Sequence, residues 1–179
     1  MPQFGNIKSF ALIFALFSSG LAYAQAGDWF LNPNIGIGTN SVQGTYIRAG
    51  LDLGVNIDER LYAGVGGFYG AGQRPEHDRE IGGGPFVGYV YPVFDFLSAQ
   101  LREDVDYVDE RNPVLNSGNP DFYTHTTSYG IESATYAGLH FSFTRHFGFS
   151  LGYRLVVGLS NSSLADGRSG LVLGFSIGF

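Results

Sequence analysis

The fold is decided by the segment Gln43-Gly-Thr-Tyr-Ile-Arg-Ala-Gly-Leu-Asp-Leu-Gly-Val-Asn-Ile57. From Thr45 onward its odd-numbered positions are mostly apolar, whereas its even-numbered positions hold glycine, tyrosine or polar residues. Because successive side chains of a β-strand point to opposite faces, this alternation predicts a strand with one apolar and one polar face.

The same parity continues through seven further segments. Of the 27 glycines, 20 fall on even strand positions and only Gly67 and Gly83 fall on odd ones. Charged residues also keep to the even face. Small and charged residues on one face, with apolar residues on the other, are typical of a membrane-spanning β-barrel. The seven segments are Trp29–Thr39, Leu61–Gln73, Ile81–Val93, Leu97–Asp109, Tyr129–Phe143, Phe147–Leu159 and Ser169–Phe179.

A soluble β-sandwich would also alternate, so two further features are needed to choose between the folds. The connections alternate in length: Asp58-Glu59-Arg60 is short, whereas the connection across 109–128 is long. Aromatic residues gather near the strand ends, as they do at membrane interfaces. We therefore predict an all-β fold, an eight-stranded antiparallel up-and-down transmembrane β-barrel whose even residues face the lumen.

Composition excludes several classes of function. The chain has no cysteine, so it lacks disulfides and thiolate chemistry. A net charge of −6 with only 10 Lys+Arg argues against nucleic-acid binding. The histidines (His77, His125, His140 and His146) have no partners at metal-ligand spacing, so we expect no metal and no cofactor.

The N-terminal residues predict a secretory signal peptide. Lys8 precedes the apolar run Phe10–Phe17, and small residues follow as Ala22-Tyr23-Ala24-Gln25-Ala26. The apolar run is too short to cross a bilayer as a helix. The expected organisation is a signal peptide at 1–24, with cleavage after 26 as the alternative, and one barrel domain at 27–179.

The even-face charges form the candidate site. Strand direction brings three arginines and several carboxylates to middle and upper depth of one narrow tube, and buried charges persist only when they are paired. We expect a lumenal ion-pair network, acting as a structural plug or as the gate of a small pore. Its residues are Arg48, Asp52, Arg102, Asp104, Glu132 and Arg154.

The C-terminal run Leu171-Val-Leu-Gly-Phe-Ser-Ile-Gly-Phe179 resembles the insertion signal read by the outer-membrane barrel assembly machinery. With the signal peptide and eight strands, the mature chain resembles the small outer-membrane barrels of the OmpA type. The resemblance implies a bacterial outer-membrane location and contact with outer-membrane lipid and lipopolysaccharide. It also implies an anchoring or adhesive role, or a narrow pore.

A local resemblance concerns Leu151-Gly-Tyr-Arg-Leu-Val-Val-Gly-Leu-Ser-Asn-Ser-Ser163, which is similar to the last loop region of the lipid A deacylases. Ser160 and Asn161 match the family's Ser-Asn pair, but Gly158 stands where the family has its histidine. The acid after Ser160 is Asp166, within the loop. A serine hydroxyl without an adjacent base is a weak nucleophile, so we expect no enzyme activity.

The sequence therefore predicts a structural or adhesive outer-membrane barrel with a largely occluded lumen and extracellular recognition loops. The alternatives are a narrow pore for water or small ions, because lumenal glycines leave space, and a degenerate deacylase-like barrel. Glu103 alone among interior odd positions is charged. We expect the fifth strand to leave the membrane at about Arg102–Glu103 and to carry Asp104, Asp106 and Asp109 outside. The alternative is a functional carboxylate held in lipid.

The mature protein is expected to begin at Gln25 or Gly27, because both positions follow an Ala-x-Ala sequence. Intact-mass spectrometry of the membrane-inserted protein measures this directly. Retention of residues 1–24 would contradict the signal-peptide prediction.

Overall fold

The computed structural model describes residues 26–40, 44–72, 79–115, 123–144, 146–160 and 169–179. The predicted signal peptide therefore lies outside the described residues, as do His77 and Asp166. The strands are β1 (Trp29–Asn40), β2 (Gly44–Asn56), β3 (Leu61–Gly72), β4 (Arg79–Phe94), β5 (Leu97–Leu115), β6 (Tyr123–Thr144), β7 (Phe147–Gly158) and β8 (Gly170–Gly178).

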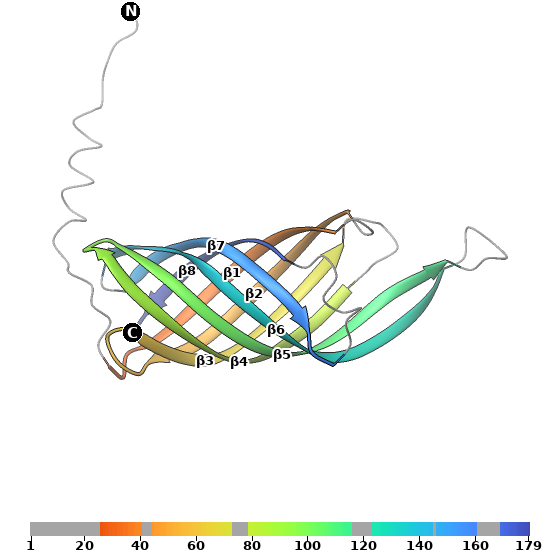
Figure 1. Cartoon of the computed structure of the whole chain (residues 1–179), viewed down its shortest axis with the longest axis horizontal. Coiled ribbons are helices and arrows are strands. Elements are labelled where there is room, and N and C mark those ends of the chain that lie inside the picture. Colours follow the sequence, from red (N-terminus) through yellow and green to blue (C-terminus); the bar gives the residue numbers. More distant parts are fainter. Residues whose placement is uncertain (1–25, 41–43, 73–78, 116–122, 145, 161–168) are drawn as a thin grey trace, which may run out of the picture.

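The eight strands form one closed antiparallel barrel in sequence order (Figure 1), which confirms the predicted fold class. β1 closes the barrel by pairing with β2 on one side and with β8 on the other; Ile35 is opposite Ala49 and Leu173. Closure leaves the sheet without a free edge along the barrel wall, as a strand-built membrane span requires. Among the described residues, no helix is both long and apolar enough to cross a bilayer.

The predicted parity decides which residues face outward. Leu51 and Val65 are 51% and 58% exposed on the outer surface, whereas Arg48 and Asp52 are 6% and 3% exposed in the lumen. In solution such an outer surface would be far larger than a tolerable apolar patch. The wall is therefore built for an apolar environment outside and a polar one inside.

Aromatic rings occupy much of the space that the lumenal glycines leave. The ring of Phe30 lies against Gly54, that of Tyr62 against Gly88, and that of Tyr136 against Gly152. Phe30 and Tyr62 meet edge to face at 5.7 Å between ring centroids. The sequence argument that glycines would leave the lumen open is wrong at these positions, because a ring from a neighbouring inward position covers the glycine.

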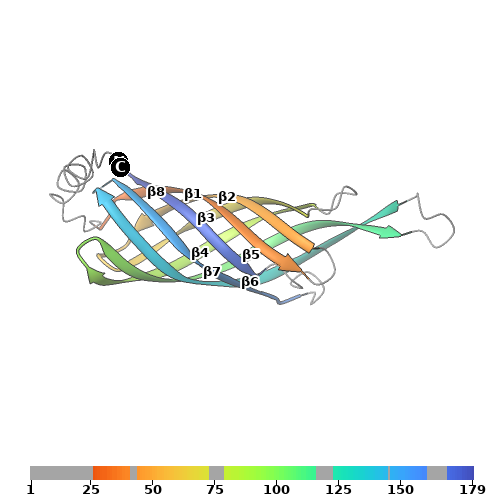
Figure 2. The same cartoon turned by 90° about the horizontal axis from the view of Figure 1, so that it is seen from above.

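The short turns share one end of the barrel with the C-terminus (Figures 1 and 2). Asp58 shapes the β2–β3 turn, since its Oδ1 accepts the backbone N–H groups of Arg60 and Leu61 at 2.7 and 2.6 Å. These two hydrogen bonds hold the pKa of the Asp58 carboxyl below its usual value. Trp29 and Phe179 exchange backbone hydrogen bonds at 3.2 and 2.9 Å, which fixes the last strand residue against the first.

β5 and β6 continue well beyond the other strands at the opposite end (Figures 1 and 2). Their pairing runs without a break from Leu97 opposite Phe141 to Leu115 opposite Tyr123. Much of the segment 109–128, predicted as a loop, is therefore a two-stranded ribbon. Thr, Tyr and Val at the extended positions favour strand structure, a signal that the sequence argument did not use.

The predicted exit of the fifth strand at Arg102–Glu103 is wrong. Asp104 and Asp106 are only 4% and 3% exposed and face the lumen. Glu103 lies four positions inward of Tyr107 along β5, within the apolar wall. The error arose because carboxylates that are paired inside a barrel were interpreted as solvated groups.

Two glycines of β3 test this architecture. A methyl group on Gly64 would collide with the Leu53 carbonyl oxygen and the Phe86 ring, whereas one on the outward Gly67 would meet its nearest atom at 3.8 Å. Gly64→Ala should therefore lower the free energy of unfolding by about 1–3 kcal/mol through overpacking. The matched control Gly67→Ala should leave it unchanged or slightly raised. Urea titration in lipid vesicles measures both, and equal effects would contradict the assigned faces.

Candidate functional site in the lumen

The inward positions of five strands bring the charged residues together in two clusters. We call Asn32, Asn34, Asp52, Arg102 and Asp104 the turn-end cluster, because it lies toward the short turns. We call Arg48, Glu80, Asp106, Glu132 and Arg154 the loop-end cluster, because it lies toward the longer connections. Strand alternation alone explains why these side chains point inward.

Arg102 is the centre of the turn-end cluster. Its Nη1 and Nη2 donate to the two carboxylate oxygens of Asp52 at 2.5 and 3.1 Å, and its guanidinium also bonds to Asp104. This fork-like contact is the geometry that makes arginine–carboxylate pairs strong. The guanidinium carbon lies 3.8 Å from the centroid of the Phe86 ring, which adds a cation–π contact.

Two asparagines complete the coordination of Asp52. The Nδ2 groups of Asn32 and Asn34 donate to Asp52 Oδ2 at 3.0 and 3.1 Å. Asp52 is therefore held by one cation and two neutral donors from β1 and β5. Such saturation is what a buried carboxylate needs to remain charged.

The loop-end cluster consists of five charged side chains, compared with three in the turn-end cluster. Arg48 lies 3.5 Å from Asp106, 3.5 Å from Glu132 and 3.8 Å from Glu80. Arg154 binds Asp106 at 2.6 Å and lies 3.9 Å from Glu132. The side chain of Glu132 is fully buried. The Phe68 ring lies flat against Arg48, with the guanidinium carbon 3.0 Å from its centroid.

The six residues singled out from the sequence thus separate into two groups. Arg102, Asp52 and Asp104 contact one another, and so do Arg48, Glu132 and Arg154. No contact between Arg48 and Asp52 is found, although the two share β2. Because the two residues are four positions apart on the same strand, their side chains lie at different depths in the lumen.

The sequence argument missed several members of these clusters. Glu80 directly precedes the predicted strand Ile81–Val93, and its even parity matches the lumen face of β4, where it is buried. Asp106 was assigned to the exterior and in fact bridges Arg48 and Arg154. Phe68 and Phe86 are on even positions that the pattern treated as polar or small; only the three-dimensional packing shows that they stack on arginines.

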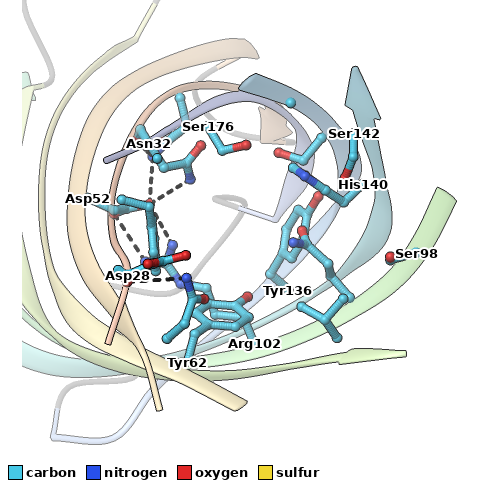
Figure 3. A pocket seen from close by; sticks show the side chains of 18 of the residues that line it. Asp28, Asn32, Asp52, Tyr62, Ser98, Arg102, Tyr136, His140, Ser142 and Ser176 are labelled. Atoms are coloured by element: carbon cyan, nitrogen blue, oxygen red, sulfur yellow. Dashed lines mark hydrogen bonds and ion pairs between the residues drawn. The ribbon is translucent and has the colours of Figure 1, made fainter. Parts of the chain in front are cut away.

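A cavity of about 230 Å³ lies between the turn-end cluster and the short turns (Figure 3). Amide, hydroxyl and imidazole groups line it, including Asn32, Ser142, Ser176 and His140, and the rings of Tyr62 and Tyr136 form part of its wall. Arg102 and Asp52 stand at its inner side. A second cavity of about 20 Å³ lies beside Arg48 and Tyr46, with room for about one water.

Metal binding and serine chemistry find little support among the described residues. They contain no group of three or more His, Asp or Glu side chains arranged to hold a metal ion. Ser160 follows the end of β7, and its Oγ accepts the backbone N–H of Ile131 on β6 at 2.8 Å, so this hydroxyl has a structural partner. Gly158, in the position of the deacylase histidine, pairs with Glu132 as the last residue of β7.

Solved structures with the same architecture are membrane barrels. Neisserial surface protein A matches with a TM-score of 0.66 at 14% identity, over 86% of this chain and 98% of that one. The chain has the fold of the small outer-membrane β-barrels. The N-terminal barrel domain of Pseudomonas aeruginosa OprF matches with a TM-score of 0.61 at 14% identity, over 87% of this chain and 100% of that domain.

A third match carries a descriptive name. Ail, the attachment invasion locus protein of Yersinia pestis, aligns with a TM-score of 0.55 at 12% identity, over 87% of this chain and 99% of that protein. No protein-family model matches the sequence, and no curated protein matches it. The likeness is therefore one of fold, and the lumen and the loops must be interpreted from their own residues.

Removal of Arg102 tests the turn-end cluster. Arg102→Met should lower the free energy of unfolding by about 3–5 kcal/mol, because it leaves Asp52 and Asp104 buried without their cation. The double variant Arg102→Met with Asp52→Asn should recover part of that loss. Urea titration in vesicles measures the cycle, with Gln100→Met on the cavity wall as a control. Additive losses would show that the charges act as independent, solvated groups.

Proposed function

We propose that the protein is an attachment barrel of a bacterial outer membrane, with a lumen closed by its ion-pair clusters and a recognition element formed by the β5–β6 ribbon. The single observation that carries the proposal is the ribbon, which extends a strand pair past the wall (Figures 1 and 2). The name of the matched attachment invasion locus protein agrees with this role.

The ribbon offers backbone groups to a partner. Within the described part of the chain, β4 pairs with β5 as far as Arg111, and β7 pairs with β6 as far as Glu132. Next to Glu132, the Ile131 carbonyl accepts the backbone N–H groups of Leu159 and Ser160. Farther out, the described register pairs the two strands only with each other. Unpaired strand edges are templates for adding an extended peptide from another protein.

The two edges of the ribbon differ in chemistry. The β5 edge carries Pro113, which cannot donate a backbone hydrogen bond. The β6 edge reads Thr124-His-Thr-Thr-Ser-Tyr129, without proline or an acidic or basic charge apart from the histidine. Thr and Tyr favour strand pairing. We therefore assign recognition to the β6 edge and an extended segment of a foreign protein as its ligand.

The burial of the lumenal charges supports the proposal that the lumen is closed. The side chain of Arg48 is 7% exposed, that of Glu80 is 2% exposed and that of Glu132 is fully buried. A barrel of eight strands has an interior that side chains just fill. The alternative function, a narrow pore for water or small ions, would use the 230 Å³ cavity as its vestibule. A continuous path would then have to cross both clusters.

The remaining parts of the proposal concern location and assembly. We propose that the short turns face the periplasm, that the wall contacts outer-membrane lipid and lipopolysaccharide, and that the barrel assembly machinery reads the strand ending in Phe179. Exposed Phe175, Ile177 and Phe179 on the outer face of the last strand support this. A degenerate deacylase activity is less well supported, because Ser160 lacks a histidine partner.

A variant with a shortened ribbon distinguishes the proposed attachment function from the alternative pore function. Replacing residues 112–126 with Asn-Gly joins Arg111 to Thr127, which are opposite each other, through a two-residue hairpin turn. Cells displaying this variant should lose at least tenfold in adhesion to surfaces coated with serum proteins, while heat-modifiable gel mobility stays that of a folded barrel. Unchanged adhesion would contradict the assignment.

Ion conductance of the wild-type protein and of the shortened variant can be measured in planar bilayers. Both proteins should be non-conducting, because the two ion-pair clusters lie in the lumen and are not altered when the ribbon is shortened. Steady ion conductance by the wild-type barrel would favour the pore instead.

A further inference from the structure

The outer wall holds one polar site, centred on Glu103. Glu103 lies on the outward face of β5, four positions inward of Tyr107 and six positions from Leu97 at the short-turn end. With a strand rise of about 3.3 Å and a tilt of roughly 40°, it lies roughly 10 Å inside the ring of interfacial tyrosines. Since the apolar band of such barrels is about 25 Å tall, this is near mid-membrane.

Two hydroxyl groups of the adjacent strand hold the carboxylate. Glu103 is opposite Thr135 in the β5–β6 register, and Ser133 is opposite Val105. Thr135 Oγ1 donates to Glu103 Oε2 at 2.7 Å, and Ser133 Oγ donates to Oε1. Each carboxylate oxygen therefore has one neutral donor and retains capacity for another.

The residues around this carboxylate differ in size from strand to strand. Ser133, Thr135 and Ala137 give the outward face of β6 small side chains, whereas exposed Leu101 and Val105 stand on β5. Exposed Leu155 and Val157 stand on the other side, on β7. Small residues with hydroxyl groups are what membrane-spanning segments use to approach one another closely.

The site lacks a cation of its own. Between the aromatic ends of the described strands, no outward position carries lysine or arginine. An ionised carboxylate in hydrocarbon is costly, and two neutral hydrogen bonds offset only part of that cost. A basic group supplied from outside the chain would provide the missing charge and use the remaining acceptor capacity of the carboxylate.

We propose that Glu103, Ser133 and Thr135 form a docking site for a membrane-spanning segment of another protein that carries a lysine or arginine at mid-membrane. Depth argues against lipid as the source, because lipid amines lie at the interface, beyond the tyrosines. Charge argues against a second copy, since a copy would bring another carboxylate and no cation. The site is independent of the ribbon and of the lumen.

A synthetic helix tests the site in proteoliposomes. The probe is a fluorescent, single-spanning leucine–alanine peptide with one central lysine, and its matched control has leucine at that position. The barrel carries the substitution Asp95→Cys in the β4–β5 turn, and an acceptor dye is attached there, so that energy transfer measures association. The lysine peptide should associate at least tenfold more tightly than the leucine peptide with the wild-type barrel.

Three variants define which groups are needed. Glu103→Gln should abolish the preference for lysine. Ser133→Ala with Thr135→Ala should weaken it severalfold, because the carboxylate is then no longer oriented. Glu103→Leu with Leu139→Glu, which moves the carboxylate along the wall to a position opposite Ala99, should not restore wild-type affinity. Circular dichroism and heat-modifiable mobility confirm that each variant is folded.

Three outcomes would overturn the proposal. The first is equal association of the lysine and leucine peptides with the wild-type barrel, and the second is a lysine preference that survives in Glu103→Gln. The third is self-association of peptide-free barrels that depends on Glu103, because it would assign the face to a second copy. None of these outcomes bears on adhesion by the ribbon, which is measured separately.

Discussion

Every feature of this protein depends on closure of one antiparallel sheet. In hydrocarbon each backbone N–H and C=O must find a partner within the protein, and a strand-built wall achieves this only if its first and last strands pair. Here β1 meets β8, and Trp29 exchanges backbone hydrogen bonds with Phe179. Closure divides all side chains into two environments, and the parity of each strand follows from that division.

Inside the wall, each of the three arginines contacts two or three carboxylates. Arg102 forms ion pairs with two aspartates, and Asp106 forms ion pairs with both Arg48 and Arg154. Aromatic rings shield the guanidinium groups from the adjacent cavity, with Phe86 on Arg102 and Phe68 on Arg48. Packing of rings against glycines and pairing of charges thus occur together in the same lumen.

Outside the wall, two features depart from what closure requires. The β5–β6 ribbon continues past the last positions at which β4 and β7 pair with it among the described residues. Glu103 places a carboxylate on an outward surface that, among the described residues, is otherwise uncharged at that depth. Neither feature is needed to close the barrel, and the contacts with other proteins that we propose depend on these two features.

The alternating pattern was sufficient to predict the barrel, the strand number and the face of most strand residues, because a period of two is a local property that needs no knowledge of distant contacts. It did not prevent the wrong prediction that Asp104 and Asp106 lie outside. It also identified six of the charges that the structure brings into two clusters. Tertiary structure alone decided the rest: which arginine meets which carboxylate, how rings cover glycines, and how far β5 and β6 extend. Those depend on register between strands far apart in sequence, which parity leaves undetermined. Glu103 illustrates the limit, since its charge was visible in the sequence, whereas its depth and its two hydroxyl partners follow only from the pairing of β5 with β6.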